Sequence, residues 1–106
     1  MHIHLIIGGG RITHYLVNII DKLGVTSKII ESDMNKCIEL NETLPDTIVI
    51  NGVGTDHELL LSENLHDADA FIALTGIDEE NIITSLFAIN NNVKNVTPNL
   101  SIILTK

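Results

Sequence analysis

The glycine triplet Gly8-Gly9-Gly10 is the stretch of this sequence best suited to binding chemistry. It follows the apolar run Ile3–Ile7 and precedes a segment with helical periodicity, which is the context that a phosphate-binding turn needs. Gly8 permits a tight turn, Gly10 lets a pyrophosphate approach the backbone, and the amides and dipole of the following helix favour negative charge. The third position of this fingerprint, usually glycine or alanine, is Thr13. The turn predicts a dinucleotide site, and the structural alternative is an ordinary strand–helix turn.

A carboxylate stands at the matching distance along the chain. Glu31 follows Gly10 by 21 positions and ends a second β-rich run, Val25–Ile30. A carboxylate there accepts hydrogen bonds from adenosine ribose hydroxyls and repels a 2′-phosphate, so NAD is favoured over NADP. Arg11 is a cation in the first helical turn, where the helix dipole disfavours it. A contact with the ligand and simple solvent exposure both remain open for Arg11.

For the remaining reactive side chains, structural roles are expected. Cys37 is expected to be buried and inert, and one cysteine forms no internal disulfide. The acidic run Asp78–Glu80 suits a helix N-terminus, the alternative being a cation or nucleotide contact joined by Asn81. His2 and His4 alternate along the first strand, and no metal site is predicted from them.

Periodicity places these residues on alternating strands and helices. The expected strands are Ile3–Ile7, Val25–Ile30, Thr47–Ile50, Ala70–Leu74 and Val93–Thr97, with a last apolar piece at Leu100–Leu104. The expected inward helix faces are Ile12, Leu16, Ile19, Ile20 and Leu23; then Met34, Cys37 and Ile38; and finally Ile82, Ile83, Leu86 and Phe87. Thr55 is expected to cap a short helix that ends at Leu61.

Alternation of strand and helix indicates parallel βαβ units with right-handed crossovers. The strands are runs of isoleucine and valine, as expected when both faces of a parallel sheet are covered. The predicted fold is therefore α/β, a Rossmann-like doubly wound parallel sheet forming one domain over residues 1–106. Because the first strand begins almost at Met1, we expect the chain to be a piece of a longer protein.

Composition excludes several classes of partner. Fourteen acidic residues against six basic ones give a formal charge of −8, which disfavours nucleic acid and anionic membrane surfaces. No apolar run is long enough for a transmembrane helix, and no signal peptide opens the chain, so a cytoplasmic setting is expected.

Four motifs in order resemble those of a known family. They are Gly8-Gly9-Gly10-Arg11-Ile12, Ile29-Ile30-Glu31, Asn51-Gly52-Val53-Gly54-Thr55-Asp56 and Leu74-Thr75-Gly76-Ile77-Asp78-Glu79-Glu80-Asn81. Together they resemble the regulator of potassium conductance, or TrkA-N, domain of the Trk and Ktr potassium-uptake systems. The resemblance covers nearly the whole chain.

This resemblance implies a regulatory module that binds NAD or NADH, with ATP or ADP as the alternative. It implies assembly as a dimer or ring beside a membrane-embedded potassium transporter subunit, on the cytoplasmic side of the membrane and without insertion into it. Carried over by position, the predicted ligand contacts are Gly8, Gly9, Gly10, Arg11 and Ile12 at the phosphates, Glu31 at the ribose, Asn51, Gly52 and Val53 at the adenine, and Thr75 and Gly76 at the distal phosphate or sugar.

Two other functions remain open. The chain could be the coenzyme domain of an NAD-dependent oxidoreductase separated from its catalytic domain, but it contains no catalytic motif, and 106 residues leave no room for a substrate domain. It could also be a degenerate assembly domain that has lost its ligand through Thr13 and Val53. We therefore predict a regulatory domain that is not an enzyme.

Overall fold

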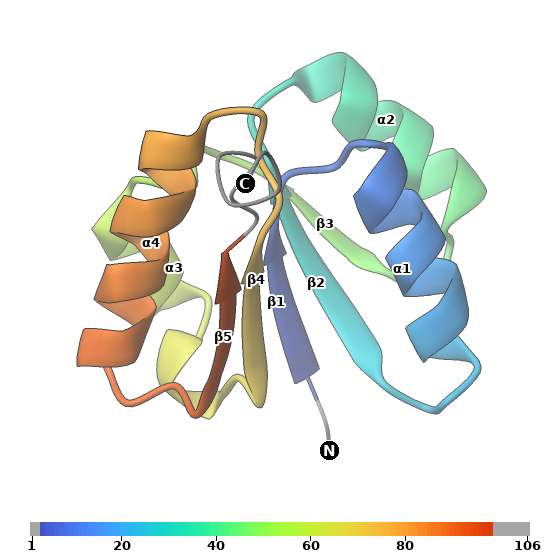
Figure 1. Cartoon of the computed structure of the whole chain (residues 1–106). Coiled ribbons are helices and arrows are strands. Elements are labelled where there is room, and N and C mark those ends of the chain that lie inside the picture. The colour runs from blue at the N-terminus through green and yellow to red at the C-terminus, as the bar shows by residue number, and fades with distance from the viewer. Residues whose placement is uncertain (1–2, 99–106) are drawn as a thin grey trace, which may run out of the picture.

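The computed structural model describes residues 3–98, and within them strands and helices alternate (Figure 1). In chain order the elements are β1 (Ile3–Ile7), α1 (Arg11–Asp21), β2 (Thr26–Glu31), α2 (Met34–Thr43), β3 (Ile48–Asn51), α3 (His57–Ser62), a 3₁₀ turn (Leu65–Asp67), β4 (Ala70–Ala73), α4 (Asp78–Asn90) and β5 (Asn95–Pro98). The predicted strand at Leu100–Leu104, like His2, lies outside the described residues.

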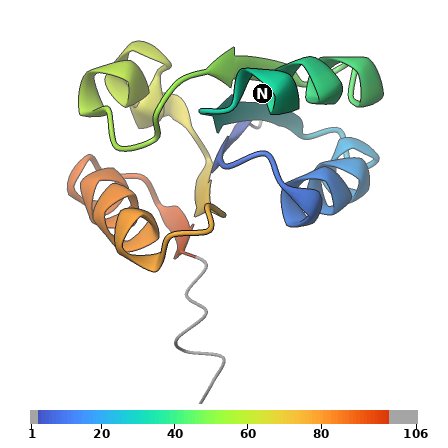
Figure 2. The ribbon, with the colours of Figure 1, turned by 90° about the horizontal axis from the view of Figure 1, so that it is seen from above.

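The strands form one parallel sheet in the order β3-β2-β1-β4-β5. Helices α1 and α2 cover one face and α3 and α4 the other, as the two ribbon views show (Figures 1 and 2). The chain runs from β1 outward to β3 and then returns to β4 on the other side of β1. The predicted Rossmann-like, doubly wound fold is therefore confirmed.

The hydrophobic core is divided by the sheet into two clusters. Side chains that alternate along β1 point to opposite faces, so Leu5 and Ile7 pack with Phe71 under α3 and α4, and Ile6 packs with Val17 under α1 and α2. Leu5, Ile6 and Ile7 are all buried, so apolar residues occupy both faces of β1, as expected for a central parallel strand.

The predicted inward faces of the helices are partly wrong. Helix α1 buries Ile20 as predicted, but its other buried residues are Thr13 and Val17, and the exposed fractions of Ile12 and Leu23 are 60% and 73%. Most of the residues predicted to face inward are exposed, namely Ile12, Ile19, Leu23, Met34, Ile38, Ile82, Ile83 and Leu86. Short helices that lie flat on a sheet bury a narrow stripe, and small or polar residues fill it where the helix packs closely.

Two further boundaries differ from the sequence prediction. Asp56, rather than Thr55, caps α3, because its carboxylate accepts a hydrogen bond of 3.2 Å from the amide of Leu59. The last described strand begins at Asn95, since Val93 is buried in the turn that follows α4.

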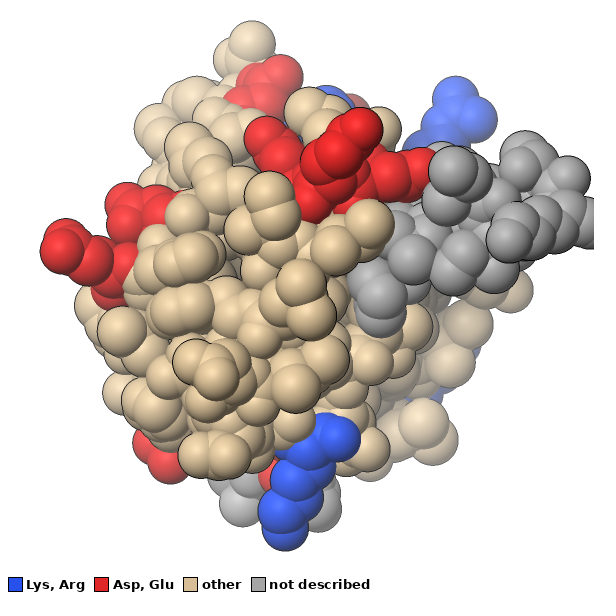
Figure 3. Space-filling view, turned by 60° about the vertical axis from the view of Figure 1, so that its left-hand side comes forward, with Lys and Arg blue, Asp and Glu red and all other residues tan. Residues whose placement is uncertain are grey.

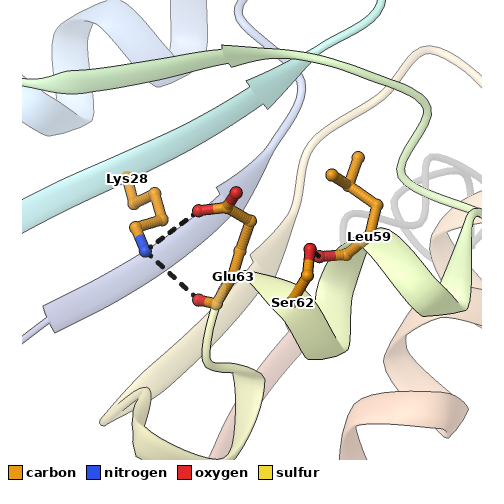
Figure 4. A network of polar contacts seen from close by, with 4 residues as sticks. All are labelled: Lys28, Leu59, Ser62 and Glu63. Atoms are coloured by element: carbon orange, nitrogen blue, oxygen red, sulfur yellow. Dashed lines mark hydrogen bonds and ion pairs between the residues drawn. The ribbon is translucent and has the colours of Figure 1, made fainter.

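An ion pair joins β2 to the end of α3 (Figure 4). The ammonium of Lys28 lies 3.2 Å from a carboxylate oxygen of Glu63 and donates to its backbone carbonyl at the same distance. The hydroxyl of Ser62 donates to the carbonyl of Leu59 at 2.7 Å, which closes the last turn of α3. These contacts lie away from the carboxyl ends of the strands, so we assign them to the support of the fold.

Candidate nucleotide-binding cleft

A cleft of about 380 Å³ opens at the carboxyl end of the sheet. The loops after four strands line it, contributing Gly8–Gly10 after β1, Glu31 and Ser32 after β2, Gly52–Gly54 after β3 and Leu74–Ile77 after β4. The chain connections leave β1 in opposite directions, so the cleft lies at the topological switch point of the sheet. Open α/β sheets bind their ligands at this point.

The turn after β1 requires glycine at its first position. Gly8 has a φ of +103°, and a Cβ atom there would lie 2.7 Å from the carbonyl oxygen of Leu74 in the neighbouring loop. Thr13 is fully buried, and its hydroxyl donates a hydrogen bond to the carbonyl of Gly8. Thr13 therefore anchors the glycine turn from the first turn of α1, a role that its position in the fingerprint does not reveal.

The N-terminus of α1 is left open toward an anion. Its N-cap residue is Gly10, which supplies no side-chain hydrogen bond to the first turn. In contrast, α2 is capped by Asp33, which accepts hydrogen bonds from the amides of Asn35 and Lys36, and α3 is capped by Asp56. Uncapped amides at a helix N-terminus, together with the helix dipole, are suited to a phosphate group.

The two ends of the cleft differ in charge. The first turn of α4 contains Asp78, Glu79 and Glu80, and Glu80 lines the cleft. On the opposite side Lys36, in the first turn of α2, lines the cleft next to Gly9 and Gly10. Phosphates are therefore favoured at the α1 end, between the glycine turn and Lys36, and repelled from the α4 end.

Glu31 lines the cleft and is buried, with an exposed fraction of 7%. One carboxylate oxygen accepts a hydrogen bond of 2.7 Å from the amide of Gly9, and the other accepts one of 2.6 Å from the amide of Asp33. A carboxylate has about four acceptor sites, so both oxygens retain capacity for hydroxyl donors. The residue thus ties the glycine turn to β2 and presents acceptors where a ribose is expected.

The structure brings together most of the predicted contact residues. Of the eleven positions predicted, the cleft lining contains Gly8, Gly9, Gly10, Glu31, Gly52, Val53, Thr75 and Gly76. Asn51 does not line the cleft; its amide donates to the carbonyls of Glu31 and Ser32 and ties the end of β3 to β2. Ile12 is exposed outside the cleft. That these residues bind a nucleotide remains a prediction.

Arg11 lies beside a second groove rather than in the cleft. This groove, of about 390 Å³, runs between α1 and α2 and shares Gly9, Gly10 and Lys36 with the cleft. Lys36 is a lining residue that the sequence analysis did not assign to the site, and Glu80 belongs to the acidic run for which a nucleotide contact was the alternative to a role at the helix N-terminus. For Lys36 the signal was present, because a cation in a first helical turn is unfavourable by the same dipole argument as for Arg11.

Cys37 lies behind the cleft and is buried, as predicted. Burial raises the pKa of its thiol, the nearby charges of Glu31 and Asp33 raise it further, and the hydrogen bond from Asn51 opposes them. We therefore expect Cys37 to react with a disulfide reagent far more slowly than a free thiol at neutral pH, and at the free rate only in denaturant. Labelling of the native protein at the free-thiol rate would contradict the described packing.

Two kinds of feature are absent from residues 3–98, the part of the chain that the structure describes. Within this range no three His, Cys, Asp or Glu side chains come together in a group that could hold a metal ion. Nor does any helix of that range combine the length and apolar character needed to cross a membrane.

The parallel sheet, its strand order and the cleft at the switch point define a domain of Rossmann-like fold. The TrkA-N domain family matches residues 4–103, and the chain belongs to this family. It is 43% identical over 93 residues to the Trk system potassium uptake protein TrkA homolog 2 of Methanosarcina mazei, an alignment that covers 87% of this chain and 21% of that protein. With the Trk system potassium uptake protein TrkA of Halomonas elongata it shares 38% identity over 92 residues, covering 87% and 20%. The chain thus spans about a fifth of the length of these relatives.

Solved structures share the fold. The GsuK channel bound to NAD superposes with a TM-score of 0.74 at 23% identity, over 91% of this chain and 17% of that one. The TrkA-N domain of the inner membrane protein ybaL from Escherichia coli gives a TM-score of 0.62 at 14% identity, over 98% and 91%. A dTDP-glucose 4,6-dehydratase from Bacillus anthracis in complex with NAD gives 0.65 at 14% identity, over 85% and 33%. These likenesses show the fold.

Proposed function

We propose that this chain is the nucleotide-binding regulatory domain of a potassium uptake system. The observation that supports this most is the cleft: the loops Gly8–Gly10 and Thr75–Ile77 line it together with Glu31, in a chain of the TrkA-N family. Relatives of this chain are named as potassium uptake proteins. The partner that the domain controls is a membrane-embedded potassium transporter subunit, and the domain acts from the cytoplasmic side.

The ligand that suits the cleft is NAD or NADH. The uncapped N-terminus of α1 receives the pyrophosphate, and the carboxylate of Glu31 receives the ribose hydroxyls. The fold is shared with the GsuK channel bound to NAD. ATP or ADP is the alternative, since either presents the same adenosine and a phosphate chain to the same groups.

A thermal-shift panel of NAD⁺, NADH, ATP, ADP and NADP⁺ tests the ligand. A ligand at about 100 times its Kd stabilises the fold by about 2.7 kcal/mol, which is readily seen for a domain of this size. We expect one or both members of the NAD pair to raise the midpoint most and NADP⁺ to raise it least. If none of the five changes the midpoint, the chain is better described as an assembly domain without ligand.

The regulatory role is favoured over the oxidoreductase alternative by the named relatives, which are uptake proteins. The dehydratase with bound NAD shares the fold at 14% identity, and a shared fold alone does not imply a shared reaction. The domain works by population shift: a nucleotide that binds one arrangement of packed domains more tightly than another biases the transporter by that difference in affinity.

Such a mechanism needs packing between copies, and α4 offers the surface. This helix buries three polar residues, Asn81, Thr84 and Ser85, beside Ala88, and it exposes several large apolar side chains. We call the exposed side the α4 face; it consists of Ile82, Ile83, Leu86 and Ile89, with exposed fractions of 40–59%. A surface helix of a globular domain normally has the reverse arrangement, and a contiguous apolar patch marks an interaction site.

The charges at the two ends of α4 are complementary to those of a second copy of this chain. Figure 3, which brings the α4 side of the molecule forward, shows a broad uncharged surface with acidic side chains at its upper and left margins and a basic side chain at its lower margin. Along the chain, the first turn of α4 contains Asp78, Glu79 and Glu80, and Lys94 follows the C-terminal end of the helix. A two-fold axis that pairs two α4 helices antiparallel brings each acidic turn toward the Lys94 of the other copy. Two chains of charge −8 also approach at least cost through an uncharged face.

We expect Leu86→Glu to weaken self-association by about tenfold or more, because two new carboxylates would face each other across the axis. The matched control is Leu23→Glu, an exposed leucine beyond the end of α1, which should leave association unchanged. Sedimentation velocity over a concentration series measures both. Equal association of both variants and the parent chain would place the interface elsewhere.

A further inference from the structure

The loop Thr75-Gly76-Ile77 joins the cleft to α4. All three residues line the cleft, and α4 begins at the next residue. Strand β4 ends at Ala73, so the backbone of Thr75 has passed beyond the hydrogen-bond ladder of the sheet. Its polar groups therefore need partners from elsewhere, and those partners decide where this side of the cleft lies.

Asn81 supplies the partners. Its side-chain oxygen accepts hydrogen bonds from the amide of Thr75 at 3.1 Å and from the hydroxyl of Thr75 at 2.7 Å. Its side-chain nitrogen donates to the carbonyl of Thr75 at 3.0 Å. One amide thus satisfies both backbone groups and the side chain of a single cleft residue.

The environment of Asn81 is that of a core residue. It is fully buried on the inner side of α4, where an apolar side chain is the usual choice. Burying a primary amide costs free energy unless it is hydrogen-bonded, so the site tolerates asparagine through its bonds with Thr75. Asn81 is not among the residues that line the cleft, whereas its partner Thr75 is.

The same residue stands one position before the α4 face. Ile82 and Ile83 follow it directly and are exposed on the outer side of the helix. A helix of 13 residues moves as a rigid body to a first approximation, so a displacement of Thr75 is passed to α4 through the bonds with Asn81.

We propose that Asn81 is a positioning residue that holds the Thr75–Ile77 loop in register with α4, so that nucleotide in the cleft is coupled to packing at the α4 face. This inference rests on the proposed function and adds the element that connects its two surfaces. Asn81 thereby sets both the ligand affinity of the cleft and the dependence of self-association on ligand.

The test compares Asn81→Leu with Thr84→Val. Thr84 is buried on the same side of α4, but its hydroxyl bonds only to the carbonyls of its own helix, Glu80 and Asn81, among the described residues. For each variant, the Kd for NAD⁺ is measured by calorimetry, the self-association constant by sedimentation with and without NAD⁺, and stability by urea unfolding. We expect Asn81→Leu to weaken NAD⁺ binding by about tenfold or more and to abolish the effect of NAD⁺ on self-association. Thr84→Val should change the Kd for NAD⁺ by no more than about twofold, and the effect of NAD⁺ on self-association by no more than about twofold.

Should Asn81→Leu fail to fold, Asn81→Asp keeps the size of the side chain and an acceptor oxygen, and replaces the donor to the Thr75 carbonyl. A carboxylate opposite that carbonyl repels it, whereas a protonated carboxyl group donates to it. The loss of NAD⁺ affinity relative to the parent chain should therefore shrink as pH falls from about 8 to about 5, because burial raises the pKa of a carboxyl group. A role in stability alone would not produce this recovery of affinity.

The outcomes separate the two proposals. Parent protein that binds no nucleotide overturns the proposed function and this inference with it. Parent protein that binds NAD⁺, together with an Asn81 variant of unchanged affinity and unchanged ligand-dependent association, overturns this inference alone. Equal losses in the Asn81 and Thr84 variants would also overturn it, because they would show a general effect of packing in α4.

Discussion

Replacing Gly8 by alanine is expected to lower the free energy of unfolding by about 2–4 kcal/mol. Two costs add at this position. The φ of +103° is unfavourable for a residue with a side chain, and the new Cβ would lie 2.7 Å from the carbonyl oxygen of Leu74, which is backbone and has little room to move. Urea unfolding followed by circular dichroism measures the change.

Gly76→Ala is the matched control for Gly8→Ala. Gly76 lines the same cleft, its φ lies outside the left-handed region, and a Cβ there would meet no atom within 4 Å. We expect its free energy of unfolding to change by no more than about 0.5 kcal/mol. Equal stability of the two variants would show that the loops after β1 and β4 are not packed as described.

Replacing Glu31 by alanine is expected to weaken NAD⁺ binding by about tenfold or more. The substitution removes the acceptors for the ribose, and it also releases the amides of Gly9 and Asp33 that the carboxylate holds. The glycine turn then loses its tie to β2, so we expect the unfolding free energy to fall by about 1–3 kcal/mol as well. Calorimetric titration with NAD⁺ and NADP⁺ measures the Kd for each ligand. We expect the ratio of the Kd for NADP⁺ to the Kd for NAD⁺ to be smaller in Glu31→Ala than in the parent chain.

The control is Glu42→Ala, which changes the net charge of the chain by the same amount as Glu31→Ala. Glu42 is exposed on α2. It should leave both affinity and stability near those of the parent chain. The two ligands must be compared on each variant separately, because the loss of a negative charge by itself favours any anionic ligand. Retention of full NAD⁺ affinity by Glu31→Ala would exclude Glu31 from the ribose site.

The sheet and the core of the cleft could be predicted from the sequence because each depends on local patterns. Continuous isoleucine and valine runs mark buried parallel strands, and the glycine turn with Glu31 keeps a fixed spacing along one βαβ unit. Topology then requires the loops after β1 and β4 to meet. No additional long-range information is needed to bring Gly8 next to the loop of Thr75.

The helix faces could not be predicted because apolar periodicity does not tell which apolar stripe is buried. On α4 the sequence analysis chose Ile82, Ile83 and Leu86, and the structure buries Asn81, Thr84 and Ser85 in their place. The reason is a contact that apolar periodicity does not record: Asn81 faces inward, where its side chain bonds to the loop at Thr75. Once Asn81 faces the sheet, the helical period of 3.6 residues turns the isoleucines outward.

The central claim is that an adenine dinucleotide binds in the cleft at the switch point. The measurement that tests it most directly is titration of ¹⁵N-labelled protein with NAD⁺, followed by the backbone amide resonances. We predict saturable shifts, with one common Kd, for the glycines that line the cleft, Gly8, Gly9, Gly10, Gly52, Gly54 and Gly76, and none for Gly24 at the opposite end of α1. Absence of shifts at millimolar NAD⁺, or shifts confined to residues outside the cleft, would contradict the claim.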